Sequence, residues 1–257
     1  MTKIDKIETT LYRLPLPEAV EAASSGVMAD IDMVMVRVWD SDGAQGCGYN
    51  PLFSGQGSAL VEIINNVCTE IVLQEDPSRI EWIWHKMWRR LHYAGRGGPV
   101  SFAIAAVDTA LWDLKANSLN LPLWRLLGGF NPEVKAYAGN IDLNFPIDKL
   151  LDGADKSLSD GHTSIKMRLG KPSLKEDLSR VEAMRAHIGP DIELMADANE
   201  AWRPDQALRA LRALREFDLV WVEEPIQPDN FAAYAHLRNN GGVPLSAGEN
   251  LHTLAEF

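Results

Sequence analysis

Cysteine is scarce in this chain. Its 257 residues include only two, Cys47 and Cys68, and their spacing is not typical of a metal or redox motif. This argues against a disulfide framework and favours a reducing, cytoplasmic location. No apolar run approaches the roughly 18 residues that a membrane span needs, and residues 1–10 lack the apolar stretch of a secretory signal. We therefore expect no membrane partner.

Positive charge is also in short supply. The chain has 25 Lys and Arg against 36 Asp and Glu, so its formal net charge is -11. Nucleic-acid binding needs a basic surface, and we expect no nucleic-acid partner. An anionic substrate would have to be captured by a local cation. The hydrophobic fraction of 46% fits a globular protein with a sizeable core in one or two domains.

The N-terminal half changes from strand patterns to helix patterns. Residues 3–14 alternate between apolar and polar, which predicts a strand that Pro15 and Pro17 end. Residues 18–30 are small, polar and glycine-containing, which predicts a mobile loop, and residues 50–57 are predicted to form a second flexible loop on the other side of a hairpin. Amphipathic helices follow, up to a pair of glycines. We expect an α+β domain over residues 1–128.

Residues 129–257 alternate short apolar runs with helical patterns. The runs that predict strands are residues 134–139, 163–168, 192–197, 219–223 and 243–248. Such alternation predicts a parallel α/β sheet, either doubly wound or closed as a (β/α)8 (TIM-type) barrel. Charged residues at the carboxyl ends of several strands favour the barrel, whose active sites lie at that face. A doubly wound nucleotide-binding sheet is less favoured, because no glycine-rich turn follows the first strand.

Three carboxylates close successive apolar runs: Asp197, Glu223 and Glu249. They are 26 residues apart (223 − 197 and 249 − 223), which is about one βαβ repeat and places them at equal height on neighbouring strands. Carboxylates without His or Cys select a hard cation, Mg²⁺ before Mn²⁺. A substrate carboxylate held there would have its charge neutralised, which makes its α-proton removable. The competing interpretation is helix capping by Asp197 and Glu249.

Two cations precede the carboxylates. Lys166 and Arg168 lie two residues apart on one strand and therefore point the same way. Burial of both is plausible only with acidic partners, which the three carboxylates supply. Lysine can act as a base when its pKa is lowered, whereas arginine stays protonated. Asn199 follows Asp197 by two residues and is placed to bind substrate or orient a water molecule.

The motifs KMR, DAN, EEP and GEN, in this order and spacing, resemble the enolase superfamily, in particular its mandelate racemase branch (the mandelate racemase/muconate lactonizing enzyme family). The resemblance covers the whole chain. It implies a capping domain with two loops that close over the substrate, followed by the barrel. It also implies Asp197, Glu223 and Glu249 as Mg²⁺ ligands and an enolate formed from a small hydroxy-carboxylate such as an acid sugar. A homo-oligomer is a further expectation from the resemblance.

One departure from the family pattern affects the expected chemistry. The branch usually has Lys-x-Lys on this strand, with the second lysine as base, and here Arg168 stands at that position. The resemblance then implies chemistry led by the opposite face, where the family has a histidine and an aspartate. We therefore predict a Mg²⁺-dependent acid-sugar dehydratase, a carbon–oxygen hydro-lyase. A racemase or epimerase is the alternative, which Arg168 disfavours because that reaction needs a base on both faces.

A second departure concerns length. The sequence stops at Phe257, just after the fifth predicted strand, whereas a barrel of this type has eight. From this we expect a barrel truncated after strand five. The corresponding alternative function is a non-catalytic fragment that lacks the histidine and aspartate of the opposite face.

Overall fold

The computed structural model describes residues 2–257, and these form two compact units. Unit 1 consists of residues 2–17, Ala29–Val134 and Leu251–Phe257. Unit 2 consists of Glu18–Met28 and Lys135–Asn250. The two units are therefore interleaved along the chain.

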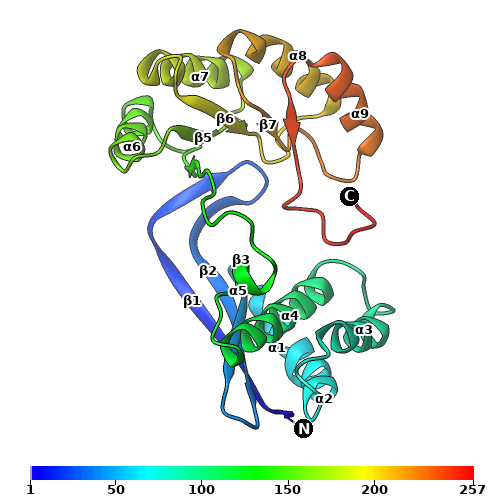
Figure 1. Ribbon diagram of the computed structural model, residues 1–257. Coiled ribbons are helices and arrows are strands. Elements are labelled where there is room, and N and C mark those ends of the chain that lie inside the picture. Colours follow the sequence, from blue (N-terminus) through cyan, green and yellow to red (C-terminus); the bar gives the residue numbers. More distant parts are fainter. Residues whose placement is uncertain (1) are drawn as a thin grey trace. The chain divides into compact units, whose positions relative to one another are not determined.

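The sheet of unit 1 has three strands in the order β1-β2-β3 (Figure 1). Their bounds are β1 Ile4–Ala22, β2 Gly26–Asp40 and β3 Gln45–Phe53. Every second residue from Val34 to Val38 is buried, so one face of β2 packs on the core and the other does not. β2 and β3 pair antiparallel, with Val36 opposite Gly48 and Val38 opposite Gly46.

The structure corrects the prediction of two mobile loops at residues 18–30 and 50–57, because both segments contribute residues to this sheet. Residues 18–30 form the ends of β1 and β2 and the turn between them, and β3 continues to Phe53. Pro15 and Pro17 do not end the first strand. β1 lies at the edge of the sheet, where a residue without an N–H group is tolerated because one side of the strand has no partner.

Helices cover the sheet of unit 1. They are α1 Gly57–Ile63, a π-helical turn Ile64–Cys68, α2 Thr69–Val72, α3 Ile80–Leu91, α4 Pro99–Ser118 and α5 Leu123–Leu126. The long helix α4 lies against β3 so closely that a Cβ on Gly46 would be 2.2 Å from the Ala110 carbonyl oxygen, and one on Gly48 2.2 Å from that of Ala106. Only glycine permits this approach of a strand to a helix backbone.

The sheet of unit 2 is parallel, in the order β4-β5-β6-β7-β8, with helices α6 to α9 along its outer side (Figure 1). The elements are β4 Ala138–Gly139, α6 Ile147–Ser159, β5 Ser164–Arg168, α7 Leu174–Ile188, β6 Glu193–Asp197, α8 Pro204–Leu214, a 3₁₀ turn Arg215–Phe217, β7 Val222–Glu223, α9 Phe231–Asn240 and β8 Leu245–Ser246. Strand order follows chain order without the reversal of a doubly wound sheet. This is the arrangement of consecutive strands in a barrel.

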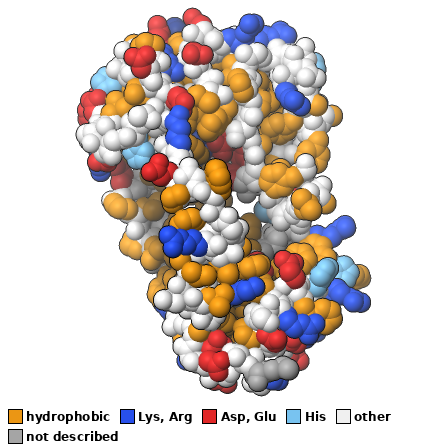
Figure 2. Space-filling model, viewed as in Figure 1, with side chains coloured by type: hydrophobic (Ala, Val, Ile, Leu, Met, Phe, Trp, Pro, Cys, Tyr) orange, Lys and Arg blue, Asp and Glu red, His pale blue; other side chains and the backbone are white. Residues whose placement is uncertain are grey.

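The surface carries charges of both signs. On the face seen in Figure 2, Lys and Arg side chains are interspersed with Asp and Glu. The helices in the described part of the chain include no candidate for a membrane span.

Candidate active site

Strand register brings the predicted charged residues together at one edge of the unit 2 sheet. Arg168 at the end of β5 is opposite Asp197 at the end of β6, and Asp197 is opposite Glu223 at the end of β7. Glu223 in turn is opposite Ser246 of β8, three residues before Glu249. The carboxyl ends of parallel strands meet at one edge, so register places Asp197 beside Glu223, whereas Glu249 follows the end of β8 by three residues and is not at the equal height that the 26-residue repeat predicted.

Lys166 and Arg168 bind the carboxylates directly. Lys166 Nζ donates to Asp197 Oδ2 at 3.0 Å and to Glu223 Oε2 at 2.8 Å. Arg168 Nη1 donates to Asp197 Oδ2 and, at 2.5 Å, to Asn199 Oδ1. Asp197 is fully buried and therefore needs these cations, because an unpaired charge is costly out of water.

Asn199 connects the two sides of this group. Its Nδ2 lies 3.4 Å from Glu249 Oε1, and its backbone N–H donates to Asp197 Oδ1 at 3.0 Å. Its φ of 39° lies in the left-handed region, which asparagine tolerates better than most residues. The sharp turn after β6 thus places Asn199 between Arg168 and Glu249.

The electrostatics of the group follow from burial and crowding. Burial acts to lower the pKa of Lys166, but hydrogen bonds to Glu223 and Asp197, together with their charges, outweigh it and raise that pKa. Lys166 is therefore a protonated ammonium in this arrangement. Burial, followed by repulsion from Asp197, raises the pKa of Glu249. The carboxylates thus repel one another and favour a cation among them.

The donor set fits a hard divalent cation, since all three predicted ligands offer carboxylate oxygens. Within residues 2–257, no three acidic, His or Cys side chains are already gathered as a metal centre. Asp197 and Glu223 are instead bridged by Lys166. Metal ligation by Asp197, Glu223 and Glu249 therefore stays a prediction, as do the roles of Lys166, Arg168 and Asn199.

A second group of polar residues, Glu200, Glu224 and Asn250, lies next to the predicted ligands. No role was predicted for them from the sequence. Glu224 is fully buried, and its Oε2 accepts from Asn250 Nδ2 at 2.9 Å. Asn250 also donates to Glu200 Oε1 at 3.0 Å. Burial raises the pKa of Glu224 to about 7. Each of these three residues directly follows a residue of interest in DAN, EEP or GEN, so position in the motif was the available signal.

The tip of the β1–β2 hairpin, Glu18–Met28, belongs to the same unit. Lys149 pairs with Glu18, and Asn144 Nδ2 donates to the Ala19 carbonyl at 3.4 Å. A Cβ on Gly170, just after β5, would lie 2.8 Å from the Cβ of Ala23. The hairpin tip therefore packs on the segments that follow β4 and β5.

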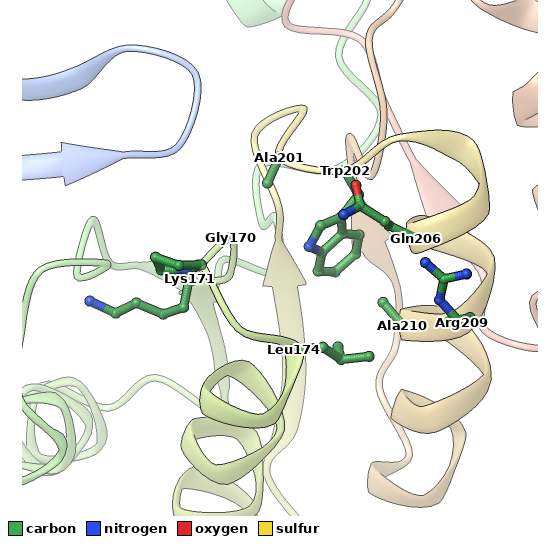
Figure 3. A pocket seen from close by; sticks show the side chains of 9 residues that line it. Gly170, Lys171, Leu174, Ala201, Trp202, Gln206, Arg209 and Ala210 are labelled. Carbon is green, nitrogen blue, oxygen red and sulfur yellow. The ribbon is translucent and has the colours of Figure 1, made fainter.

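A pocket of about 280 Å³ lies beside this contact, between the first turns of α7 and α8 (Figure 3). Its lining consists of Gly170, Lys171, Pro172, Leu174, Ala201, Trp202, Gln206, Arg209 and Ala210. The Lys171 side chain points away from Trp202 and Arg209, and Arg209 pairs with Asp205 at 3.0 Å. None of the predicted site residues lines this pocket.

Comparison with known proteins identifies the class. Residues 6–128 match the mandelate racemase/muconate lactonizing enzyme N-terminal domain, and residues 149–257 match the enolase C-terminal domain-like family. The chain therefore belongs to the mandelate racemase/muconate lactonizing enzyme family of the enolase superfamily. The predicted family and the α/β fold, with an N-terminal domain and a barrel-like C-terminal domain, are confirmed.

Individual relatives show which enzymes this chain is similar to. The chain is 46% identical to 3,6-anhydro-alpha-L-galactonate cycloisomerase of Streptomyces coelicolor, over 99% of the chain and 70% of that enzyme. It is 32% identical to L-talarate/galactarate dehydratase of Salmonella typhimurium, over 99% of the chain and 65% of that enzyme. A racemase from Streptomyces coelicolor, solved with bound magnesium, superposes with a TM-score of 0.97 at 46% identity, over 98% of the chain and 71% of its own.

These relatives are metabolic enzymes of several reaction types. Dehydratases, cycloisomerases and racemases all occur among them. Magnesium is bound in solved members of the family, which confirms the predicted cofactor. The chain spans about two thirds of the length of these relatives.

Proposed function

We propose that this protein catalyses Mg²⁺-dependent β-elimination from a sugar acid: a base on the face opposite Lys166 and Arg168, where the family has a histidine, takes the proton α to the carboxylate, and the bond between the β-carbon and its oxygen substituent breaks. The observation that carries the proposal is the convergence of Lys166, Arg168, Asp197 and Glu223 at the carboxyl edge of β5 to β7. Acid sugars are the substrates named for the Salmonella and Streptomyces relatives.

Asp197, Glu223 and Glu249 would hold the ion. When bound, Mg²⁺ neutralises the substrate carboxylate and so makes the α-proton more acidic. Lys166, whose Nζ lies 3.0 Å from Asp197 Oδ2 and 2.8 Å from Glu223 Oε2, would place a positive charge next to the developing enolate. Arg168 donates to Asn199 Oδ1 and offers positive charge rather than base catalysis, because a guanidinium is a poor base.

The hairpin tip Glu18–Met28 would complete the site as a specificity segment. Its contacts with Asn144, Lys149 and Gly170 join it to the segments that follow β4 and β5. A segment that covers the substrate excludes water, which strengthens every electrostatic interaction within. This proposal keeps the substrate-closing role expected for residues 18–30, but assigns it to a hairpin.

The leaving oxygen distinguishes two candidate reactions. In a dehydratase, as predicted from the sequence, the β-hydroxyl leaves as water. In a 3,6-anhydro sugar acid the β-oxygen belongs to the ring ether, so the same elimination opens the ring and loses no atoms. The 46% identity to the Streptomyces cycloisomerase favours ring opening as the second candidate. Racemisation is less favoured, since Arg168 is a poor base.

Incubation in D₂O with Mg²⁺ separates these candidates. The probes are galactarate, L-talarate and 3,6-anhydro-L-galactonate, followed by NMR and mass spectrometry. Dehydration gives a keto acid lighter by one water, whereas ring opening gives a keto acid isomeric with the probe apart from deuterium. Exchange of the α-proton into both epimers without a keto acid would indicate a racemase. No exchange and no product with any probe would overturn the proposal and favour a non-catalytic protein.

Three broader proposals accompany the reaction. They are a domain division at residues 128 and 129, a homo-oligomer and a cytoplasmic location. The family matches to residues 6–128 and 149–257 support the first. Light scattering of the purified protein tests the second, since a mass of 28.5 kDa would contradict it.

A further inference from the structure

A carboxylate that the chemistry above does not use lies beside Arg168. Asp142, in the segment after β4, is 2% exposed. Its Oδ1 accepts the backbone N–H of Arg168 at 2.9 Å. Its Oδ2 is buried and has no hydrogen-bond partner among the described residues. Asp142 therefore anchors the main chain at the residue whose side chain reaches Asp197 and Asn199.

Arg180 holds Asp142 in place from behind. This residue of α7 is 4% exposed, and its guanidinium donates to the Phe145 carbonyl at 2.7 Å and the Asp142 carbonyl at 2.9 Å. Its Nη2 also lies 3.5 Å from Asp142 Oδ1. A chain of contacts thus runs from α7 through Asp142 to Arg168.

Burying the Asp142 carboxylate costs free energy that a side chain used only for packing would not cost. Burial raises the pKa of Asp142 to about 6, even though the Arg168 N–H and the charge of Arg180 act against it. An apolar group would fill the same space without a desolvation penalty. We explain the carboxylate at this position by the hydrogen bond that it accepts from the Arg168 N–H, because this bond fixes the end of β5.

We propose that Asp142, held by Arg180, is a positioning residue for Arg168. It orients the end of β5 so that the guanidinium faces Asp197 and Asn199. The inference rests on the proposed function for its catalytic consequence, but its structural part is independent of any substrate.

The same helix provides a matched control. Asp177 of α7 is fully buried, and it accepts the backbone N–H groups of Gly170 and Lys171, each at 3.1 Å. It therefore performs the same kind of anchoring one segment further along, with no bond to Arg168. The pKa of Asp177 is likewise raised by burial to about 6.

Amide hydrogen exchange of the ¹⁵N-labelled protein, measured by NMR, tests the structural part. Asp142→Ala should speed exchange at the Arg168 N–H about tenfold, the effect of losing a hydrogen bond to a charged group. Exchange at Leu169, whose N–H donates to the Asp197 carbonyl, should not change. Asp142→Asn keeps an acceptor and should restore protection. Asp177→Ala should speed exchange at Gly170 and Lys171 but not at Arg168.

Equal acceleration at Arg168 and Leu169 would overturn the proposal, because it would indicate general loosening. Unchanged exchange at Arg168 would do so too. If Asp142→Ala does not fold, Arg180→Lys provides the second test. A lysine side chain at position 180 is too short to donate to both the Asp142 and the Phe145 carbonyls. Amide exchange at Arg168 should therefore become severalfold faster.

Kinetics with whichever probe is turned over test the catalytic part. Asp142→Ala should lower kcat about 10- to 100-fold, as for other residues that orient a catalytic group, with KM within about threefold and partial rescue by Asp142→Asn. Wild-type kcat in Asp142→Ala would overturn this part. Absence of turnover by the wild type would count against the proposed function alone, because the exchange data still decide whether Asp142 positions Arg168.

Discussion

Buried polar residues are divided very unevenly between the two units. Unit 1 buries only Asp32 and Asp40 among its described residues. Unit 2 buries nine, namely Asp142, Ser157, Ser164, Lys166, Asp177, Arg180, Asp197, Asn199 and Glu224. Each unit has its own hydrophobic core, so the difference does not arise because one unit lacks a buried interior. Buried charge is costly, and buried charged groups cluster at functional sites, so this contrast supports the site proposed in unit 2.

The partners of these residues sharpen the contrast. In unit 1, Asp32 accepts the N–H groups of Gly55 and Gly57 at 2.9 Å each, and Asp40 accepts that of Ala44 at 2.8 Å. Asp32 also accepts from Arg13 Nε at 3.1 Å. These bonds join β2 to β1 and to the segment that leads into α1, and close the turn between β2 and β3. In unit 2, Asp142 and Glu224 each keep one buried oxygen without a partner among the described residues. Within the described part of the chain, buried oxygens without a hydrogen-bond partner also occur in unit 1, at Thr9 and Asp30, so the number of buried charged groups, rather than incomplete satisfaction, distinguishes unit 2.

The largest effect should come from Asp197→Asn. The buried Lys166 and the partly buried Arg168 lose their shared carboxylate, so the free energy of unfolding should fall by about 3 kcal/mol. Binding of Mg²⁺ should be lost as well. Urea unfolding and titration calorimetry measure the two effects. Asp205→Asn, at an exposed ion pair of α8, should change stability by less than about 0.5 kcal/mol. If Asp197→Asn had the stability and Mg²⁺ affinity of the wild type, the buried charges of unit 2 would not have the importance that the comparison of the two units gives them.

Unit 1 should be most sensitive where backbones meet. In Gly46→Ala, the new methyl group would meet backbone atoms of Ala110 and Leu114 at 2.2 Å, which cannot move aside easily. We expect a loss of about 3 kcal/mol in thermal or urea unfolding. Gly153→Ala, inside α6 with open space around it, should instead stabilise by about 0.5–1 kcal/mol. Similar effects of the two substitutions would contradict the close packing of α4 on β3.

Asp177 should give unit 2 a distinctive pH dependence. Burial raises its pKa to about 6 against the opposing hydrogen bonds, so the folded chain binds this proton more tightly than the unfolded chain, where an Asp has a pKa of about 3.9. Its contribution to stability is complete below about pH 4 and is lost as the pH rises through about 6. Asp177→Asn should therefore lose less stability between pH 4 and pH 7 than the wild type. Parallel stability curves from urea unfolding would contradict this.

The smallest effect concerns the hairpin tip. Gly170 has a φ of 113°, and a Cβ added there would lie 2.8 Å from those of Ala23 and Ala201, whereas Gly161 has a φ of 92° and open space around it. Alanine at Gly161 should cost about 1 kcal/mol from backbone strain alone. Alanine at Gly170 should cost about 1 kcal/mol more and should speed hydrogen exchange in Glu18–Met28. Equal costs, with no change in exchange, would show that the tip does not depend on this contact.

The sequence predicted the parallel sheet and the charged edge of unit 2 because both arise from local patterns. Short apolar runs end in charges at a fixed repeat, and strand register then determines which charges meet. The β2–β3 hairpin was predicted, but the continuation of β1 through residues 15–22 into a hairpin with β2 was not. Pro15 and Pro17 are signals for the end of a strand, and only the place of β1 at the sheet edge makes them acceptable. Asp142 and Arg180 were missed because one acid after a strand and one arginine in a helix are common patterns, and their pairing depends on tertiary packing.

The interleaving of the units has a consequence for folding and for protein engineering. The chain passes from one unit to the other after residues 17, 28, 134 and 250, so no single cut separates them. A fragment of residues 135–250 would lack Glu18–Met28, and with it the partners of Lys149 and Asn144. Unit 2 is complete only when Glu18–Met28, more than a hundred residues upstream of Lys135, packs against the rest of the unit. Its completion therefore depends on long loop closure, which is a slow step in folding.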